Sequence, residues 1–172
     1  VADYLTGVNE KSENTLSVMV QNSSLISADS EDKSELRDVM SEIMQLNPLF
    51  YALYVGYENG DFYELINLES SEIVRQQLQA IEADRWVVIH ISGEGAERVQ
   101  HTHYFDQQFN LRISQTKSTS YDPRERLWFK QANSTRVNKT KPYFFTHLQA
   151  PGQTYSIKSA RENSVLALDV SL

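Results

Sequence analysis

The dipeptide Asn59-Gly60 constrains the fold of this chain more than any other feature. Apolar, aromatic-rich runs lie on both sides of it, at residues 50–55 and 62–66. Asn-Gly between two such runs is typical of a tight hairpin turn, because both residues adopt the positive φ angles that match the twist of paired strands. The sequence therefore predicts an antiparallel β-hairpin in the first half of the chain.

Helical patterns precede the hairpin. Residues 1–30 contain one glycine, no proline and loosely spaced apolar residues, which predicts a long, polar helix with one apolar side. Between Ser30 and Pro48, a cap, an acidic first turn and apolar residues at helical spacing predict a second helix. We accordingly divide the chain into N-terminal helices at residues 1–46 and a sheet-containing module at residues 47–172.

The rest of the chain predicts more strands than helices. One helix is expected to start at Asp122 and Pro123, since Asp can cap it and Pro fits its first position, and to end near Ala132. Helices that precede several antiparallel-compatible strands, rather than alternating with them, indicate an α+β fold with one central sheet. The other expected elements are a short helix after Ser70 and strands at residues 85–91, 98–105, 109–114, 142–145, 153–160 and 164–172.

Composition excludes several classes of protein. There are 23 Asp and Glu against 16 Lys and Arg, and the net charge of −7 argues against nucleic acid as a partner, because duplex binding needs a basic surface. The longest apolar run, residues 49–55, is far shorter than the about 18 residues that cross a bilayer. Cysteine is absent, which excludes disulfides and zinc–thiolate sites. The chain lacks an initiator Met, so we expect it to be part of a longer protein.

The sequence contains no residue pattern that indicates catalysis more strongly than chance would. His101 and His103 could place two imidazoles on one strand face, but no carboxylate lies at tight ligand spacing beside them, so we interpret both as ordinary strand residues. No serine lies in a nucleophile elbow, and Gly93 and Gly95 lack the third glycine of a dinucleotide site. We therefore expect no enzymatic activity, no metal and no cofactor in this segment.

The most informative segment is residues 121–132. Two guanidinium groups and three aromatic rings surround one helix start there, where free N–H groups favour an anion. Arg126 could hold a carboxylate through two hydrogen bonds, with Tyr121 and Trp128 as walls of the site. Alternatively, Trp128 and Phe129 belong to the core and both arginines to the surface. The residues alone give these two interpretations equal weight.

This segment resembles the motif of the Cache family of extracytoplasmic sensor domains, specifically the membrane-distal module of double Cache domains. The family carries Tyr-Asp-Pro-Arg-x-Arg-Pro-Trp-Tyr, then a Pro-Tyr segment and a closing strand; residues 121–129, Pro142-Tyr143 and residues 166–172 match them. The upstream helices and hairpin agree as well, so the resemblance spans nearly the whole chain. It implies a PAS-like fold, in which helices flank a five-stranded antiparallel sheet and a long N-terminal helix runs from the membrane.

The resemblance also implies a ligand site. In members that bind amino acids, the tyrosine, arginine and tryptophan of the motif contact the ligand carboxylate, and the matching residues here are Tyr121, Arg126 and Trp128. A later tyrosine and two aspartates hold the amine in those members. Tyr143 matches the tyrosine, and Asp169 matches the aspartate of the closing strand.

Two of the implied site positions depart from the family pattern. Phe129 replaces a tyrosine and loses its hydroxyl, and Phe145 replaces the other aspartate. Loss of that carboxylate removes a charge-assisted hydrogen bond of roughly 1.5–3 kcal/mol, which is about one to two orders of magnitude in affinity. An organic acid or other anionic ligand with an apolar body would suit Arg126 beside Phe129, Tyr143 and Phe145, so we favour it over a standard amino acid.

From this resemblance we expect the periplasmic, ligand-binding part of an inner-membrane receptor, whose output is a histidine kinase, a diguanylate cyclase or phosphodiesterase, or a chemoreceptor. A small organic acid or amino-acid-like ligand would favour one packing of sheet against helices, and the N-terminal helix would transmit the difference. That helix pairs with its twin in a homodimer, or else it packs only on its own domain. The alternative function is an interaction or dimerisation module whose pocket is filled by its own aromatic side chains.

Overall fold

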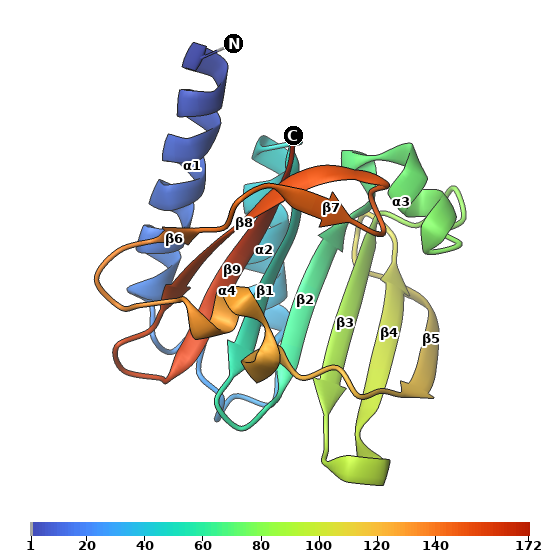
Figure 1. Cartoon of the computed structure of the whole chain (residues 1–172). Coiled ribbons are helices and arrows are strands. Elements are labelled where there is room, and N and C mark those ends of the chain that lie inside the picture. Colours follow the sequence, from blue (N-terminus) through green and yellow to red (C-terminus); the bar gives the residue numbers. More distant parts are fainter. Residues whose placement is uncertain (1) are drawn as a thin grey trace.

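The computed structural model describes residues 2–172, and it has an α+β architecture in which two helices precede one antiparallel sheet (Figure 1). The helices are α1 (Ala2–Val20), α2 (Ser34–Leu46), α3 (Glu72–Gln77) and α4 (Leu127–Lys130). The strands are β1 (Phe50–Tyr57), β2 (Phe62–Asn67), β3 (Trp86–Ser92), β4 (Val99–Phe105), β5 (Leu111–Ser118), β6 (Asn138–Lys139), β7 (Tyr143–Phe145), β8 (Ala150–Lys158) and β9 (Ser164–Ser171). Their order in the sheet is β5-β4-β3-β2-β1-β9-β8-β6, and β7 also pairs with β8.

The predicted hairpin forms the centre of the sheet. β1 and β2 pair with Tyr54 opposite Glu64. The turn between them is wider than expected: Gly60 has a φ of +95°, but Asn59 does not have a positive φ, and Tyr57 N donates to the Asp61 carbonyl oxygen across the turn. The α+β class, the antiparallel sheet and the long N-terminal helix are confirmed. The sheet has nine strands rather than the five that the resemblance implies, in part because the short segments β6 and β7 both pair with β8.

Local turns change the bounds of two predicted elements. α1 ends at Val20 and does not continue to residue 30, because the Asn22 side chain accepts a hydrogen bond from Leu25 N (3.4 Å) and so competes with helical backbone bonding. The strand predicted from Phe109 begins two residues later, since Phe109 has a φ of +60° in a turn where the Asp106 carboxylate accepts from nearby backbone N–H groups. α2 ends just before Asn47-Pro48, as predicted.

The two faces of the sheet carry separate apolar clusters. Because strand side chains alternate, Leu53 and Val55 of β1 join one cluster with Leu16 of α1, whereas Ala52 and Tyr54 face the other side. α1 and α2 lie against the first face, and α3, α4 and β7 lie over parts of the second (Figure 1). The second face therefore has room for a pocket between these smaller elements.

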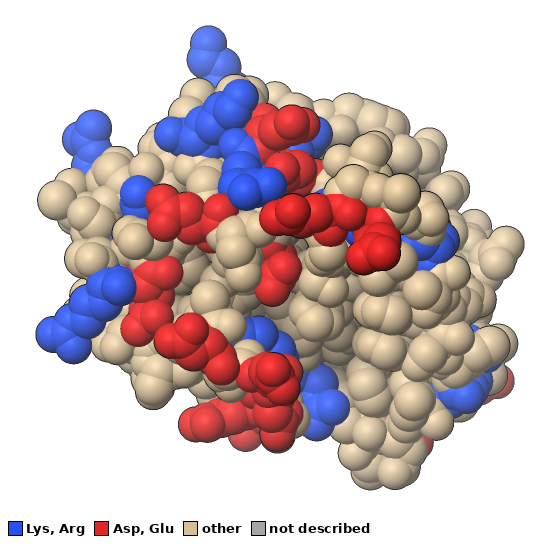
Figure 2. Space-filling view, turned by 90° about the horizontal axis from the view of Figure 1, so that it is seen from below, with Lys and Arg blue, Asp and Glu red and all other residues tan. Residues whose placement is uncertain are grey.

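The start of α1 and the end of β9 lie at the same end of the molecule (Figure 1). Figure 2 shows the opposite end, where acidic side chains form a broad arc and basic side chains are interspersed among them. Within residues 2–172, no helix combines the length and the apolar character that spanning a bilayer requires.

Candidate ligand-binding pocket

A cavity of about 820 Å³ lies on the second face of the sheet. Its floor includes Tyr54 of β1, Glu64 of β2 and Asp169 of β9. Phe129 is not among the lining residues; it packs edge-on against Trp128, with 5.9 Å between the ring centroids. The other predicted site residues come from separate parts of the sequence, and the fold brings them together around this cavity: Tyr121, Arg126, Trp128, Tyr143, Phe145 and Asp169.

The wall that starts at Tyr121 is not the single helix predicted as far as Ala132. Asp122 caps a 3-10 turn, Pro123–Glu125, as an acceptor from Arg124 N at 2.9 Å, but Arg126 then has an extended backbone (φ −83°, ψ 146°) before α4 begins. Packing explains the break. Pro123 and Trp128 both lie against Gly56 of β1, and residues five apart in a continuous helix would point about 140° apart.

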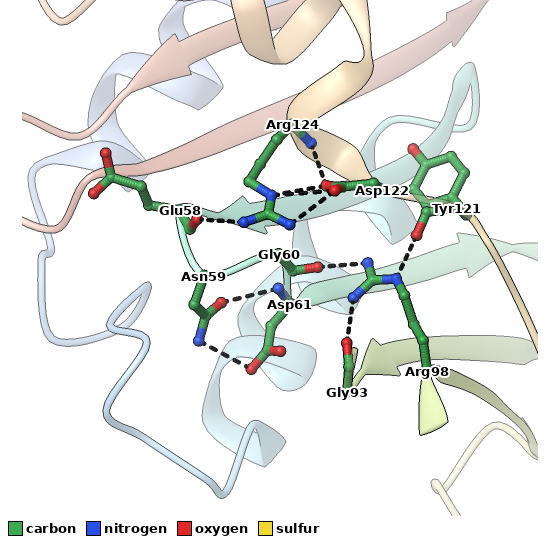
Figure 3. A network of polar contacts seen from close by, with 9 residues as sticks. All are labelled: Glu58, Asn59, Gly60, Asp61, Gly93, Arg98, Tyr121, Asp122 and Arg124. Atoms are coloured by element: carbon green, nitrogen blue, oxygen red, sulfur yellow. Dashed lines mark hydrogen bonds and ion pairs between the residues drawn. The ribbon is translucent and has the colours of Figure 1, made fainter. Parts of the chain in front are cut away.

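The two arginines of this wall lie in different surroundings. Arg124 donates to the Asp122 carboxylate from Nε and Nη2, the latter at 2.8 Å, and to the Glu58 carbonyl oxygen from Nη1 (Figure 3). Arg126 lines the cavity, and its Cζ lies 5.9 Å from the centre of the Tyr121 ring. Within residues 2–172, no side chain forms an ion pair with Arg126. Arg126 is therefore the guanidinium available to an anion in the cavity.

A third arginine, Arg98, fixes the position of Tyr121 and was missed by sequence reasoning. Its side chain is buried and donates to three carbonyl oxygens: Tyr121 at 2.8 Å, Gly93 at 2.9 Å and Gly60 at 2.7 Å (Figure 3). It thus ties the pocket wall to the β1–β2 turn and to the β3–β4 connection. An isolated arginine before a strand carries no sequence signal of this role, because its partners are backbone atoms.

A series of hydrogen bonds crosses the pocket floor. Tyr143 Oη and Thr154 Oγ1 are 2.7 Å apart, and Thr154 Oγ1 and Tyr54 Oη both donate to Asp169 Oδ1 at 2.7 Å. Asp169 is 9% exposed, and burial raises its pKa to about 6 although these donors and Arg126 oppose the shift. Its Oδ1 is thus well occupied, which leaves Oδ2 for a ligand.

Glu64 is a second carboxyl group in the cavity, and it was also missed. It is partly buried, and burial followed by the negative charge of Asp169 raises its pKa to about 8. The signal for it lies in the hairpin itself. Strand alternation places Glu64 on the same face as the buried apolar residues Phe62 and Ile66, and a carboxyl group on such a face indicates a special environment.

The histidines His101 and His103 lie on the opposite face of β4. Their Nδ1 atoms are within hydrogen-bond distance of Thr116 (3.0 Å) and Ser114 (2.6 Å) on the neighbouring strand β5. The part of the chain that the structure describes contains no group of three or more His, Cys, Asp or Glu side chains arranged to hold a metal ion.

No protein-family model matches this chain, and no curated protein matches it. Among solved structures, it is similar to the extracellular domain of a protein described as a histidine kinase, with 12% sequence identity and a TM-score of 0.45. The match covers 99% of this chain and 61% of that domain, so the chain spans less than two thirds of the domain's length.

Proposed function

We propose that this chain is the extracytoplasmic ligand-binding domain of a transmembrane receptor of the Cache type. The observation that carries the proposal is the cavity of about 820 Å³ with Arg126 in its lining and the rings of Tyr121, Trp128 and Tyr143 around it. This volume falls in the range of small-molecule sites, about 300–1,000 Å³. The ligand is a small compound that bears a carboxylate.

Arg126 provides the main attraction for that carboxylate. A guanidinium presents two parallel N–H donors to a carboxylate, and hydrogen bonds to charged groups contribute about 1.5–3 kcal/mol each. Trp128 is 4% exposed and contacts Tyr54 at 4.8 Å between ring centroids, so the aromatic wall beside Arg126 is firmly packed. Such a wall keeps water from one side of the ion pair and strengthens it.

The alternative function, an interaction module whose pocket is filled by its own aromatic side chains, has less support. Phe145, the residue most suited to fill the site, packs against Gly152 so closely that a Cβ there would overlap its ring. It also meets Tyr143 edge-on, at 4.7 Å between centroids. Both contacts hold the Phe145 ring against the cavity wall, and the cavity keeps its volume.

The proposed signal passes through β9 to α1. Asp169 faces the cavity, while its neighbours Leu168 and Val170 belong to the apolar cluster on the helix-covered face, together with Leu16 and Met19 of α1. A ligand that binds Asp169 better in one arrangement of β9 would therefore bias the packing of α1, with a coupling of about 1–3 kcal/mol. The output domain remains a prediction: a histidine kinase, a cyclase or phosphodiesterase, or a chemoreceptor.

Homodimerisation through α1 also remains a prediction. The outer part of this helix exposes Tyr4 (58%) and Leu5 (48%), and Val18 is 73% exposed farther along it. These side chains are candidates for contact with a second α1, although scattered apolar residues are common on protein surfaces.

A thermal-shift screen of organic acids and amino acids, followed by calorimetry, tests the proposal. Arg126→Ala should abolish the stabilisation by the best compound while the melting temperature without ligand changes little, because Arg126 has no ion-pair partner among the described residues. Arg124→Ala is the matched control, since it removes a guanidinium that lies outside the cavity. The proposal fails if no compound stabilises the wild type, or if both variants respond as the wild type does.

A further inference from the structure

The two carboxyl groups on the pocket floor lie on one face because of the strand register. Tyr54 of β1 pairs with Glu64 on one side, and Ala52, two residues away, pairs with Asp169 on the other. Residues two apart in a strand point to the same face, and strands two apart in a sheet are separated by about 10 Å. Side chains that lean inward from these positions can therefore reach one small group between them.

In the described part of the chain neither carboxyl group forms an ion pair, although Arg126 and Lys117 line the same cavity and the positive charge of Arg126 acts to lower the pKa of Asp169. The ion pairs of residues 2–172 involve other carboxylates, those of Asp38, Glu69, Asp84 and Asp122. Asp169 is only 9% exposed, and it accepts its hydrogen bonds from neutral hydroxyl groups through Oδ1 alone. A buried carboxyl group that forms no ion pair either keeps its proton or takes up a cation, so an ammonium group from outside the chain fits here.

We propose that Glu64 is a specificity-determining residue, which joins Asp169 in holding an ammonium group of the ligand while Arg126 holds its carboxylate. This inference rests on the proposed function and changes the expected ligand from a simple acid to a zwitterionic, amino-acid-like compound. Glu64 then supplies, from β2, the negative charge that is missing at Phe145. A motif comparison cannot find this exchange, because the two residues lie on different strands.

Protonation gives the subsite a measurable property. Because the pKa of Glu64 is raised to about 8, roughly nine tenths of the empty sites hold its proton at pH 7. An ammonium group favours ionised Glu64 and expels that proton, whereas a ligand with only a carboxylate favours the protonated form. The charged and titratable groups that share the cavity with Glu64 and Asp169 are Arg126, Lys117, His147 and four tyrosines: Tyr51, Tyr54, Tyr121 and Tyr143. Burial raises the pKa of each of these tyrosines, and burial followed by the charge of Lys117 lowers the pKa of His147, so the two carboxyl groups are the main titrating groups of the cavity between pH 7 and 8.

Matched trios of probes test the proposal. Each trio shares one side chain, for example L-phenylalanine, 3-phenylpropanoate and 2-phenylethylamine, and similar trios are built on leucine and on methionine. In calorimetry at pH 7.5, the amino acid of the best trio should bind the wild type at least tenfold more tightly than its deaminated acid. Its affinity should rise several-fold from pH 6.5 to pH 8, as the ionised fraction of Glu64 rises, and binding at pH 7 should release protons.

Glu64→Gln keeps the shape of the side chain and removes its ionisation. This variant should lose at least tenfold in affinity for the amino acid, lose the proton release, and bind the deaminated acid within threefold of the wild type. Glu58→Gln is the matched control, since it makes the same change in the β1–β2 turn outside the cavity.

Equal affinity of the wild type for the amino acid and its deaminated acid overturns the ammonium subsite but leaves the proposed function intact. Full affinity of Glu64→Gln for the amino acid overturns the role of Glu64. If no compound of any trio binds, the proposed function itself fails.

Discussion

Replacement of Arg98 by methionine tests whether one buried guanidinium holds the pocket wall in place. Methionine keeps much of the apolar volume of the side chain but removes three hydrogen bonds, to the carbonyl oxygens of Tyr121, Gly93 and Gly60. The carbonyl groups belong to three separate loops, so no neighbouring donor can replace the guanidinium for all of them.

The magnitude follows from the number and kind of bonds. Each hydrogen bond to a charged group contributes about 1.5–3 kcal/mol, but the desolvation of a guanidinium that is only 8% exposed offsets part of that sum. We therefore expect Arg98→Met to lower the free energy of unfolding by about 3–5 kcal/mol, a large part of the 5–15 kcal/mol typical of a domain. Arg98→Lys should lose about half as much, because one ammonium group cannot reach three diverging acceptors.

Urea unfolding followed by the fluorescence of Trp86 and Trp128 measures these losses. Arg124→Ala provides the scale for a surface ion pair and should cost no more than about 1 kcal/mol, since the Arg124 side chain is 44% exposed. Ligand affinity, measured well below the melting temperature of each variant, should also fall in Arg98→Met because Tyr121 loses its backbone anchor. A loss of stability below about 1 kcal/mol in Arg98→Met would refute the reasoning.

Two further predictions concern the pocket floor. The folded state raises the pKa of Glu64 to about 8 from an ordinary 4.5, so the folded chain binds more protons than the unfolded chain. The free energy of unfolding should therefore fall as the pH rises from 5 to 8, and Glu64→Gln should flatten this decline in urea titrations across that range. Parallel declines in both proteins would contradict the prediction. Tyr143→Phe breaks the 2.7 Å contact with Thr154 and should cost about 0.5–1.5 kcal/mol, whereas an unchanged urea midpoint would mean that the hydroxyl bonds water equally well.

Local patterns predicted the parts of the fold that depend on neighbouring residues. The Asn59-Gly60 turn, the strands on both sides of it and the end of α2 before Pro48 each follow from residues a few positions apart. The early end of α1 was not predicted, because the Asn22 side chain competes with the helix through one hydrogen bond that composition does not reveal. The same holds for Phe109, whose positive φ depends on a turn closed by Asp106.

The residues that the motif assigns to a ligand site line one cavity, with the exception of Phe129, and their chemistry alone did not select them. Arg126 and Trp128 were assigned to one site because they stand in one short segment, and Asp169 because it lies in the strand that resembles the closing strand of the family. Glu64 was missed because its role depends on β1 lying between β2 and β9, a long-range pairing that no local pattern encodes. Arg98 was missed because all of its partners are main-chain oxygens, which every residue carries.

The hairpin and the motif segment form one structural unit, although some 60 residues separate them in the chain. Pro123 and Trp128 can both approach β1 only because Gly56 has no Cβ, which would lie 2.9 Å and 2.8 Å from them. Their common approach breaks the helix at Arg126, and this break leaves the guanidinium at the cavity instead of along a helix surface. Glu64 enters the same cavity from the other strand of the hairpin. The turn that fixes the centre of the sheet therefore also determines which charges the pocket presents to a ligand.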